Sequence, residues 1–166
     1  DMANYGNIKY CDIANGIGIR TSVFISGCTH HCKNCFNPET WDFNYGELLT
    51  PNVITKIIDS ADPDYIDGIT LLGGDPLCGD DNRCASHTLC HMFKLKHPNK
   101  TVWLYTGYLY DQIKDLPVMD HVDVLVDGPF IEEKKNLMLK FRGSENQRLI
   151  DVKKSRLENK VILLEV

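Results

Sequence analysis

Short, continuous apolar runs alternate along this chain with segments in which apolar residues recur every three or four positions. The run RTSVFIS (20–26) is rich in β-branched and aromatic residues and predicts a strand that ends at Gly27. The runs ITLL (69–72), TVWLYTG (101–107) and VDVLVDG (122–128) predict three more strands. Runs that are apolar throughout are typical of parallel strands buried on both faces.

Helical patterns lie between these runs. Thr50 and Pro51 form an N-cap followed by proline at the first helical position, and they predict a helix through NVITKIIDS (52–60). Further helices are predicted over 80–97 and, more briefly, over 108–116. Strands that alternate with helices indicate an α/β fold with a parallel sheet.

The length of 166 residues indicates one domain with a substantial core. About four to six βα units fit in this length, whereas a complete eight-fold barrel typically needs ~250 residues. We therefore expect a partial, open barrel of parallel strands in a single domain, 1–166, with its core at about 5–150. The pattern loosens over 136–166, where we expect a hairpin or added strands, with KVILLEV (160–166) as a strand candidate.

Composition and charge exclude some classes of function. The net charge of −5, without a basic stripe, argues against nucleic-acid binding. No apolar run approaches the roughly 20 residues of a membrane span, and the first residues lack the pattern of a signal peptide. Seven cysteines, an odd number, make a poor disulfide framework but a good set of metal ligands in a reducing compartment. We expect a cytoplasmic metalloprotein.

Three of these cysteines stand close together in SGCTHHCKNCFN: Cys28, Cys32 and Cys35. Thiolates at this spacing can converge on one metal centre, but three are one short of a closed four-ligand site. A centre with three protein ligands keeps an open coordination position and is typical of reactive sites. A structural zinc site completed by His30 or His31, or by Cys11, is the alternative, although zinc sites more often use two paired Cys arms.

The candidate chemistry falls at one place in the predicted sheet. The cysteine loop follows strand 20–26, the turn GGDP (73–76) follows strand 69–72, and Thr106 and Gly107 end the next strand. Parallel strands place their carboxyl ends at one edge, and that edge is where open α/β sheets and barrels bind ligands.

A C-x₃-C-x₂-C loop after the first predicted strand, with GGDP after the second, resembles the radical S-adenosylmethionine enzymes. The resemblance implies a partial radical S-adenosylmethionine barrel with one 4Fe–4S cluster per chain. In that family the fourth iron binds the methionine moiety of S-adenosylmethionine, and the glycine-rich segment contacts its amino group. Glycines allow close approach of the backbone, and an aspartate can add charge toward an ammonium group.

A narrower resemblance follows from five blocks in the same order: NGIGIRTSVFISGCTHHCKNC, LLGGDPL, WLYTGY, VDVLVDG and RGSENQR. Together they are similar to the anaerobic ribonucleoside-triphosphate reductase activating proteins over about residues 5–150. Two departures stand out. Asn34 occupies the position before the third cysteine, where many radical enzymes carry an aromatic residue, and we expect Phe36 to lie beside the adenine instead. The extension 151–166 is not explained by the family pattern.

The resemblance implies a function. One-electron reduction of the cluster would cleave S-adenosylmethionine to methionine and a 5′-deoxyadenosyl radical, which would take a hydrogen atom from a glycine of the reductase. The implied partners are the catalytic subunit of that reductase, with its glycine loop as substrate, and a low-potential one-electron donor such as flavodoxin or ferredoxin.

The resemblance also assigns site residues. The expected iron ligands are Cys28, Cys32 and Cys35. The residues expected to contact S-adenosylmethionine are Asn34, Cys35, Phe36, Gly73, Gly74 and Asp75. No further catalytic side chain is expected, because the cluster and its cofactor carry the chemistry. Two other functions stay open: an activase of a different glycyl-radical enzyme, and a non-enzymatic zinc or iron–sulfur module.

Several other residues have a structural and a functional interpretation. The segment 15–20 could bind phosphate, but without a following helix a turn is favoured. Asp127 could contact a ribose or a partner, or simply cap a turn, and His30 and His31 are expected to lie beside the cluster or face solvent. A second metal site at Cys78, Cys84 and Cys90 with His87 and His91 is conceivable, but buried cysteines on a helix are favoured.

Overall fold

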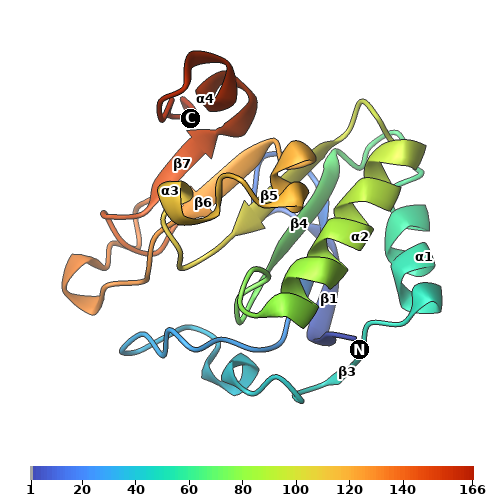
Figure 1. Cartoon of the computed structure of the whole chain (residues 1–166), viewed down its shortest axis with the longest axis horizontal. Coiled ribbons are helices and arrows are strands. Elements are labelled where there is room, and N and C mark those ends of the chain that lie inside the picture. The colour runs from blue at the N-terminus through green and yellow to red at the C-terminus, as the bar shows by residue number, and fades with distance from the viewer. Residues whose placement is uncertain (1) are drawn as a thin grey trace.

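The computed structural model describes residues 2–166. It is a mixed α/β fold built on one open sheet of seven strands in the order β3-β1-β2-β4-β5-β6-β7 (Figure 1). The centre of the sheet is parallel, as expected from the apolar runs. Its four strands are β2 (Arg20–Ile25), β4 (Gly68–Gly73), β5 (Thr101–Tyr105) and β6 (Val124–Asp127).

Both edges of the sheet are antiparallel, so the expectation of parallel strands alone is wrong there. On one side β1 (Asn4–Asp12) pairs with β2 and with the two-residue strand β3 (Glu47–Leu48). On the other side β7 (Arg148–Asp151) pairs with β6. Strand β1 was not predicted, because most of its side chains are partly or fully exposed and give no apolar run. The sheet stays open, and a closed barrel is not formed.

The helices match the predicted segments. Helix α1 (Pro51–Asp59) begins where Thr50 Oγ1 accepts a hydrogen bond from the backbone N–H of Val53, so the predicted N-cap is confirmed. Helix α2 (Asp80–Lys96) fills the second predicted segment, whereas α3 (Tyr110–Ile113) is shorter than its segment. Within residues 2–166, none of the helices combines the length and the apolar character that a membrane crossing requires.

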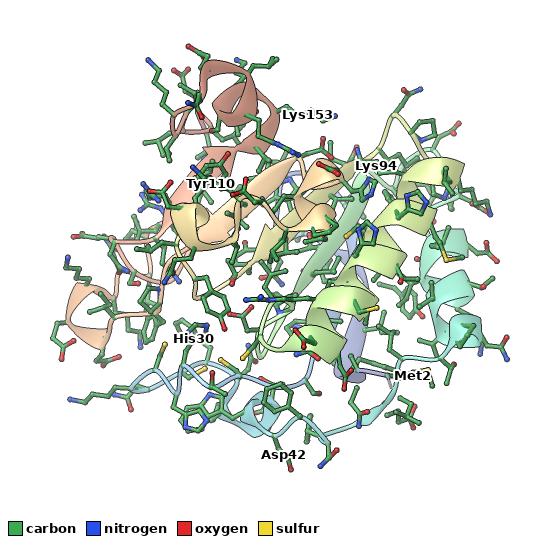
Figure 2. The ribbon with its side chains drawn as sticks, in the orientation of Figure 1. Met2, His30, Asp42, Lys94, Tyr110 and Lys153 are labelled. Carbon is green, nitrogen blue, oxygen red and sulfur yellow. The ribbon has the colours of Figure 1, made fainter. Side chains whose placement is uncertain are left out.

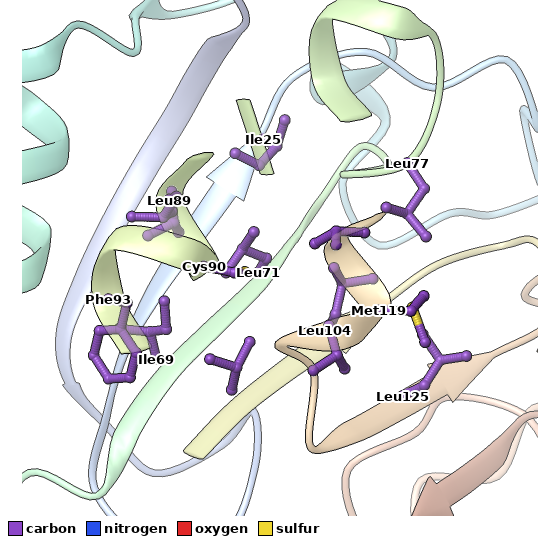
Figure 3. Close-up of a cluster of buried hydrophobic side chains, with 14 of the residues drawn as sticks. Ile25, Ile69, Leu71, Leu77, Leu89, Cys90, Phe93, Leu104, Met119 and Leu125 are labelled. Atoms are coloured by element: carbon purple, nitrogen blue, oxygen red, sulfur yellow. The ribbon is translucent and has the colours of Figure 1, made fainter. Parts of the chain in front are cut away.

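The main core lies between the sheet and these helices (Figure 3). Ile54, Ile57 and Ile58 recur at helical spacing on the buried face of α1, and Leu89 and Phe93 do the same on α2. They pack against the sheet residues Val23, Ile25, Ile69, Leu71, Leu104 and Leu125. The opposite face of the sheet carries a smaller buried cluster of Trp103, Val124, Val126 and Leu149.

Arg20 is buried at the start of β2, on the face opposite to the helices. Its guanidinium donates hydrogen bonds to Thr70 Oγ1, to Thr101 Oγ1 and to the carbonyl oxygens of Ile17, Ile69 and Thr101. Burial lowers the pKa of Arg20 to about 10. The segment before it forms bends that lead from β1 into β2, so the turn is confirmed.

The last residues add one strand, one helix and a returning segment. Helix α4 (Val152–Glu158) directly follows β7, and the chain then turns at Asn159 in the left-handed conformation. The segment 160–166 makes only an isolated bridge to β7, so the predicted strand KVILLEV is wrong as a full strand. The returning segment is joined to β7 by two backbone hydrogen bonds, from Asp151 N to Ile162 O and from Leu164 N to Leu149 O, and it is joined to α4 by hydrogen bonds with Ser155.

Candidate functional site

The structure brings the three predicted segments together at the carboxyl edge of the central strands. The cysteine loop follows β2, and Gly74, after β4, lies against the backbone of Gly27: a Cβ built on Gly74 would stand 2.8 Å from Gly27 O. The backbone N–H of Asp75 donates to Gly27 O at 2.9 Å. His30 of the same loop reaches the segment after β5 at Gly107. The expected convergence at one sheet edge is confirmed.

The first part of the cysteine loop is held by backbone hydrogen bonds. Gly27 N donates to Thr40 O at 2.7 Å and Cys28 N donates to Trp41 O at 3.1 Å, so the 3₁₀ helix η1 (Pro38–Trp41) lies directly beneath the first cysteine. Figure 1 shows this loop and η1 together along the edge of the molecule below the carboxyl ends of the strands.

The second part of the loop is a tight turn. Cys35 N donates to Cys32 O at 3.1 Å, and Asn34 adopts a positive φ of 56°. Asparagine tolerates this left-handed conformation, which a bulky aromatic residue adopts only with strain. The left-handed backbone at this corner of the loop is therefore compatible with the asparagine that the sequence places there.

The three thiols have graded exposure. Cys28 is buried, while Cys32 and Cys35 are partly exposed, and all three are free. Burial raises the pKa of Cys28 to about 12, although backbone N–H groups of His30 and His31 act in the opposite direction. Burial also raises the pKa of Cys32. Such thiols are neutral without metal, and a bound metal would deprotonate them.

The donor set fits a 4Fe–4S cluster better than a single metal ion. In the described part of the chain, no three His, Cys, Asp or Glu side chains gather closely enough to hold one ion. In an iron–sulfur cubane the cysteines bind different irons, so they need not meet at one point. The backbone N–H of Asn37 donates a hydrogen bond to Cys35 Sγ at 3.4 Å. Hydrogen bonds to sulfur tune the reduction potential of iron–sulfur clusters. A zinc site completed by His30, His31 or Cys11 is not assembled among these residues.

Gly73 and Gly74 connect β4 to the loop by close backbone packing. A Cβ on Gly74 would lie 2.6 Å from Thr40 O and within 3.0 Å of both Gly27 O and Gly27 N. Any side chain at this position would push the cysteine loop away from the sheet. The two glycines thus lie beside the loop as the sequence predicts, while their contact with a bound cofactor stays a prediction.

The Asp75 carboxylate is enclosed by hydrogen-bond donors of the protein. Its side chain is fully buried, and its two oxygens accept hydrogen bonds from His30 Nε2, Thr106 Oγ1, Gly107 N and Leu77 N. The hydrogen bond to Asp75 raises the pKa of His30. The carboxylate therefore faces the protein interior, and a direct contact with an ammonium group of a ligand stays a prediction.

Phe36 lies where the cysteine loop meets the segment between β6 and β7. Its ring centroid is 4.9 Å from that of Phe130, and Lys135 Nζ stands 5.6 Å over the Phe36 ring. The ring is 55% exposed, so one side stays open to a ligand. Asn34 is exposed on the same loop.

A hollow of about 300 Å³ lies beside the site. Phe24, which points away from the helices because successive strand residues alternate, contributes to it together with Lys9 of β1. The remaining lining residues are Gly6, Asn7, Asn37, Glu39, Thr40 and Tyr45. Because Asn37 and Thr40 follow the third cysteine closely, the hollow is adjacent to the loop that carries the thiols.

Sequence reasoning missed Asn82 of α2. Its amide is 2% exposed and donates to Ser26 O and Asp75 O, each at 3.0 Å, which joins the ends of β2 and β4. Ser86 Oγ of the same helix donates to Pro76 O at 2.9 Å. The signal was present: both polar residues occupy the inner face of a helix that otherwise buries apolar residues.

Other candidate residues have structural surroundings. Asp127 is buried and forms two hydrogen bonds with Arg148, at 3.0 and 2.6 Å, and one with Tyr110 N, so it joins β6, β7 and α3. Cys90 is buried in the main core and Cys84 is exposed. Cys78 is buried 3.3 Å from Thr29 Oγ1. These three cysteines form no common site in the described chain.

The chain matches the model of a protein family described as "4Fe-4S single cluster domain" over residues 14–150. This match covers the cysteine loop, the glycine segment and every strand from β2 to β6.

Curated proteins resemble the chain over most of its length. An "anaerobic ribonucleoside-triphosphate reductase-activating protein" of Enterobacteria phage T4 is 42% identical over 148 residues, which cover 88% of this chain and 92% of that protein. Proteins of the same name from Vibrio cholerae and from Escherichia coli (strain K12) are each 38% identical over 148 residues. They cover 87% of this chain, and 95% and 96% of their own lengths.

Proposed function

Because the chain belongs to the family of anaerobic ribonucleoside-triphosphate reductase-activating proteins, we propose that its cysteine loop is the site at which it acts on the reductase. The chain is an enzyme that activates the anaerobic reductase by generating a glycyl radical, and it uses a 4Fe–4S cluster and S-adenosylmethionine. One-electron reductive cleavage of S-adenosylmethionine is the chemistry that such a cluster supplies when bound.

Cys28, Cys32 and Cys35 hold the cluster through their thiolates. A single observation carries this assignment: the three free thiols sit on one loop whose start packs backbone to backbone against Gly74. The loop carries three cysteines, and the other four cysteines of the described chain, Cys11, Cys78, Cys84 and Cys90, lie outside it. One coordination position of the cluster thus stays open for S-adenosylmethionine.

The residues around the loop orient and shield that molecule. Gly73 and Gly74 present backbone at the carboxyl edge of β4, where a ligand ammonium group finds carbonyl acceptors. Asn34 and the open side of the Phe36 ring contact the remainder of the molecule, and the hollow beside Phe24 has room for part of it. Asp75 acts on the site indirectly, because its hydrogen bonds hold His30 and the segment after β5 in place.

The fold supports substrate access from one side. We propose that the open sheet is a partial radical S-adenosylmethionine barrel, with its helices on one face and the site at the carboxyl edge. An incomplete barrel admits a peptide segment that a closed one would exclude, so the glycine loop of the reductase is the proposed substrate. The proposed reductant is a low-potential one-electron donor such as flavodoxin or ferredoxin.

The test is anaerobic reconstitution followed by reaction with the reductase. The protein, loaded with iron and sulfide, is reduced and mixed with S-adenosylmethionine and the reductase, and electron paramagnetic resonance and product analysis are recorded. We expect about four irons per chain, a glycyl doublet and 5′-deoxyadenosine. Cys32→Ala removes the iron and both products, whereas Cys84→Ala, which changes an exposed cysteine of α2, keeps them.

Two results would contradict the proposal. A colourless protein that binds zinc in place of iron identifies a non-enzymatic module. A loaded protein that yields 5′-deoxyadenosine with another glycyl-radical enzyme, but no glycyl doublet on the ribonucleotide reductase, assigns it to a different partner.

A further inference from the structure

Two adjacent histidines of the cysteine loop have opposite surroundings. His31 is exposed, has a positive φ of 47°, and stacks on Trp41 with ring centroids 4.4 Å apart. The side chain of His30 is only 19% exposed and turns toward the sheet. Figure 2 shows His30 between the loop and the body of the protein. The position between the first two cysteines is thus occupied by an anchored side chain.

The anchor is the buried carboxylate of Asp75. His30 Nε2 donates to Asp75 Oδ2 at 2.8 Å. The other donors to this carboxylate are the backbone N–H groups of Leu77 and Gly107 and the hydroxyl of Thr106. Burying a carboxylate costs much free energy unless its oxygens accept hydrogen bonds. The loss of any one of these donors would therefore weaken the whole network around Asp75.

The segment after β5 is shaped to receive the His30 ring. A Cβ built on Gly107 would lie 2.7 Å from His30 Cδ2 and 2.8 Å from Nε2, so a residue without a side chain is required there. Tyr108 contacts the same ring edge to face, with centroids 4.7 Å apart. Arg83 of α2 in turn stacks over Tyr108. His30 is therefore held from β4, β5 and α2 together.

The other polar side-chain contacts of this stretch of the loop involve sulfur atoms. Apart from the bond of His30, the polar side-chain contacts within residues 29–34 of the described chain are to sulfur: Thr29 Oγ1 shares a hydrogen bond of 3.3 Å with Cys78 Sγ, and the backbone N–H of Phe130 interacts with the Cys32 thiol. Sulfur is a weak hydrogen-bonding partner. The bond between His30 and Asp75 is thus the principal polar link between the 28–32 segment and the sheet.

We propose that His30 is a positioning residue that clamps the cysteine loop to the ends of β4 and β5 and so fixes Cys28 and Cys32 relative to Gly73 and Gly74. This inference rests on the proposed function, because it concerns the loop that holds the cluster. His30 acts through its contact with Asp75 and needs no contact with the cluster itself. The clamp keeps the thiols in place while iron, S-adenosylmethionine and the partner glycine loop bind.

The experiment compares His30→Ala, His30→Gln and His31→Ala after anaerobic reconstitution. The readouts are the rate at which a coloured chelator removes iron, the change that S-adenosylmethionine causes in the electron paramagnetic resonance spectrum of the reduced protein, and the thermal melting curve. Loss of a hydrogen bond to a buried charge predicts iron release about tenfold faster, or more, in His30→Ala. His30→Gln can place an amide N–H where Nε2 lies and restores most of the retention. His31→Ala releases iron within about twofold of wild type, because it leaves Asp75 satisfied.

The outcomes separate the clamp from the proposed function. If wild-type protein takes up no cluster, the proposed function fails before the clamp is tested. If wild-type protein loads and His30→Ala loses iron at the same rate with an unchanged response to S-adenosylmethionine, the clamp alone is refuted. Should His30→Ala fail to fold, His30→Gln decides: iron retention close to wild type supports the clamp, and rapid loss overturns it.

Discussion

At the scale of single residues, the candidate site depends on backbone geometry as much as on ligand chemistry. Asn34 forms the left-handed corner of the turn between the second and third cysteines. Gly74 allows β4 to approach the loop at backbone distance. Asp75 is buried, and its carboxylate accepts hydrogen bonds from His30, Thr106, Gly107 and Leu77. Residues that hold no metal thus decide where the three thiols lie.

Gly74→Ala tests this close approach. Its methyl group would lie 2.6 Å from Thr40 O, and neither that carbonyl nor the backbone of Gly27 can move without displacing the loop. We expect a loss of about 2 kcal/mol in the free energy of unfolding, together with reduced iron uptake. Urea denaturation and iron analysis measure both.

Gly79→Ala is the control, because a Cβ on Gly79 would meet only Phe43 Cε2, at an ordinary contact distance of 3.8 Å, whereas Gly79, unlike Gly74, has a positive φ of 83°. We expect about 1 kcal/mol of backbone strain and unchanged iron uptake. Equal iron uptake in the two variants would show that packing at Gly74 does not position the loop.

At the scale of elements, Asp123 connects three parts of the chain. Its carboxylate accepts hydrogen bonds from Lys94 Nζ of α2 at 2.7 Å and from Val102 N of β5 at 2.8 Å. Lys153 Nζ of α4 lies 3.0 Å from its other oxygen. Burial alone would raise the pKa of Asp123, but these contacts outweigh it and leave the pKa below its ordinary value of 3.8.

This lowered pKa predicts a dependence of stability on pH. Because the folded protein binds the proton less tightly than the unfolded chain, the contribution is complete above the ordinary aspartate pKa and is lost as the pH falls below it. Asp123→Asn should unfold about 2 kcal/mol more easily than wild type at neutral pH. The difference should shrink as the pH is lowered below 3.8.

Urea denaturation across the acid range measures this difference. Asp120→Asn is the control, since its ion pair with Arg156 joins side chains that are 60% and 43% exposed and should change stability by less than about 0.5 kcal/mol. A difference between Asp123→Asn and wild type that stays constant through the acid range would contradict the assigned role.

At the scale of the whole molecule, the two edge strands of the sheet are protected from pairing with other chains in different ways. One edge ends in the two-residue strand β3. The other is β7, whose outer side is covered by hydrogen bonds from the returning segment 160–166. Exposed strand edges promote association between chains, and a short strand or a covering segment prevents it. The extension after residue 150 therefore completes the sheet at a distance from the cysteine loop (Figure 1).

Deletion of residues 160–166 should uncover β7 and cause self-association. We expect larger particles in size-exclusion chromatography with light scattering, and normal iron uptake, because the cysteine loop lies at the other end of the molecule. Leu157→Ala is the control: it changes a side chain that is 86% exposed on α4 and leaves β7 covered. A truncated chain that stays as dispersed as wild type would argue against a covering role.

The sequence predicted strands and helices most accurately where an element buries one face or all of its side chains. The apolar runs of β2, β4, β5 and β6 and the helical spacing of α1 and α2 were confirmed, because a buried face leaves a periodic pattern in the sequence. Strand β1 escaped prediction, since it pairs with β2 through backbone hydrogen bonds while most of its side chains stay at least partly exposed. The segment 160–166 reads as a strand but has length for only one bridge to β7.

The sequence by itself determined the cysteine triplet, the order of the central elements and the convergence of three segments at one sheet edge. These follow from local spacing and from the geometry of parallel strands, which place their carboxyl ends together. The roles of Asp75, Asn82 and His30 were decided only by the tertiary structure. Whether a buried polar group faces a ligand or the protein depends on which distant donors fold against it, and residues more than 30 positions apart in the chain make those contacts.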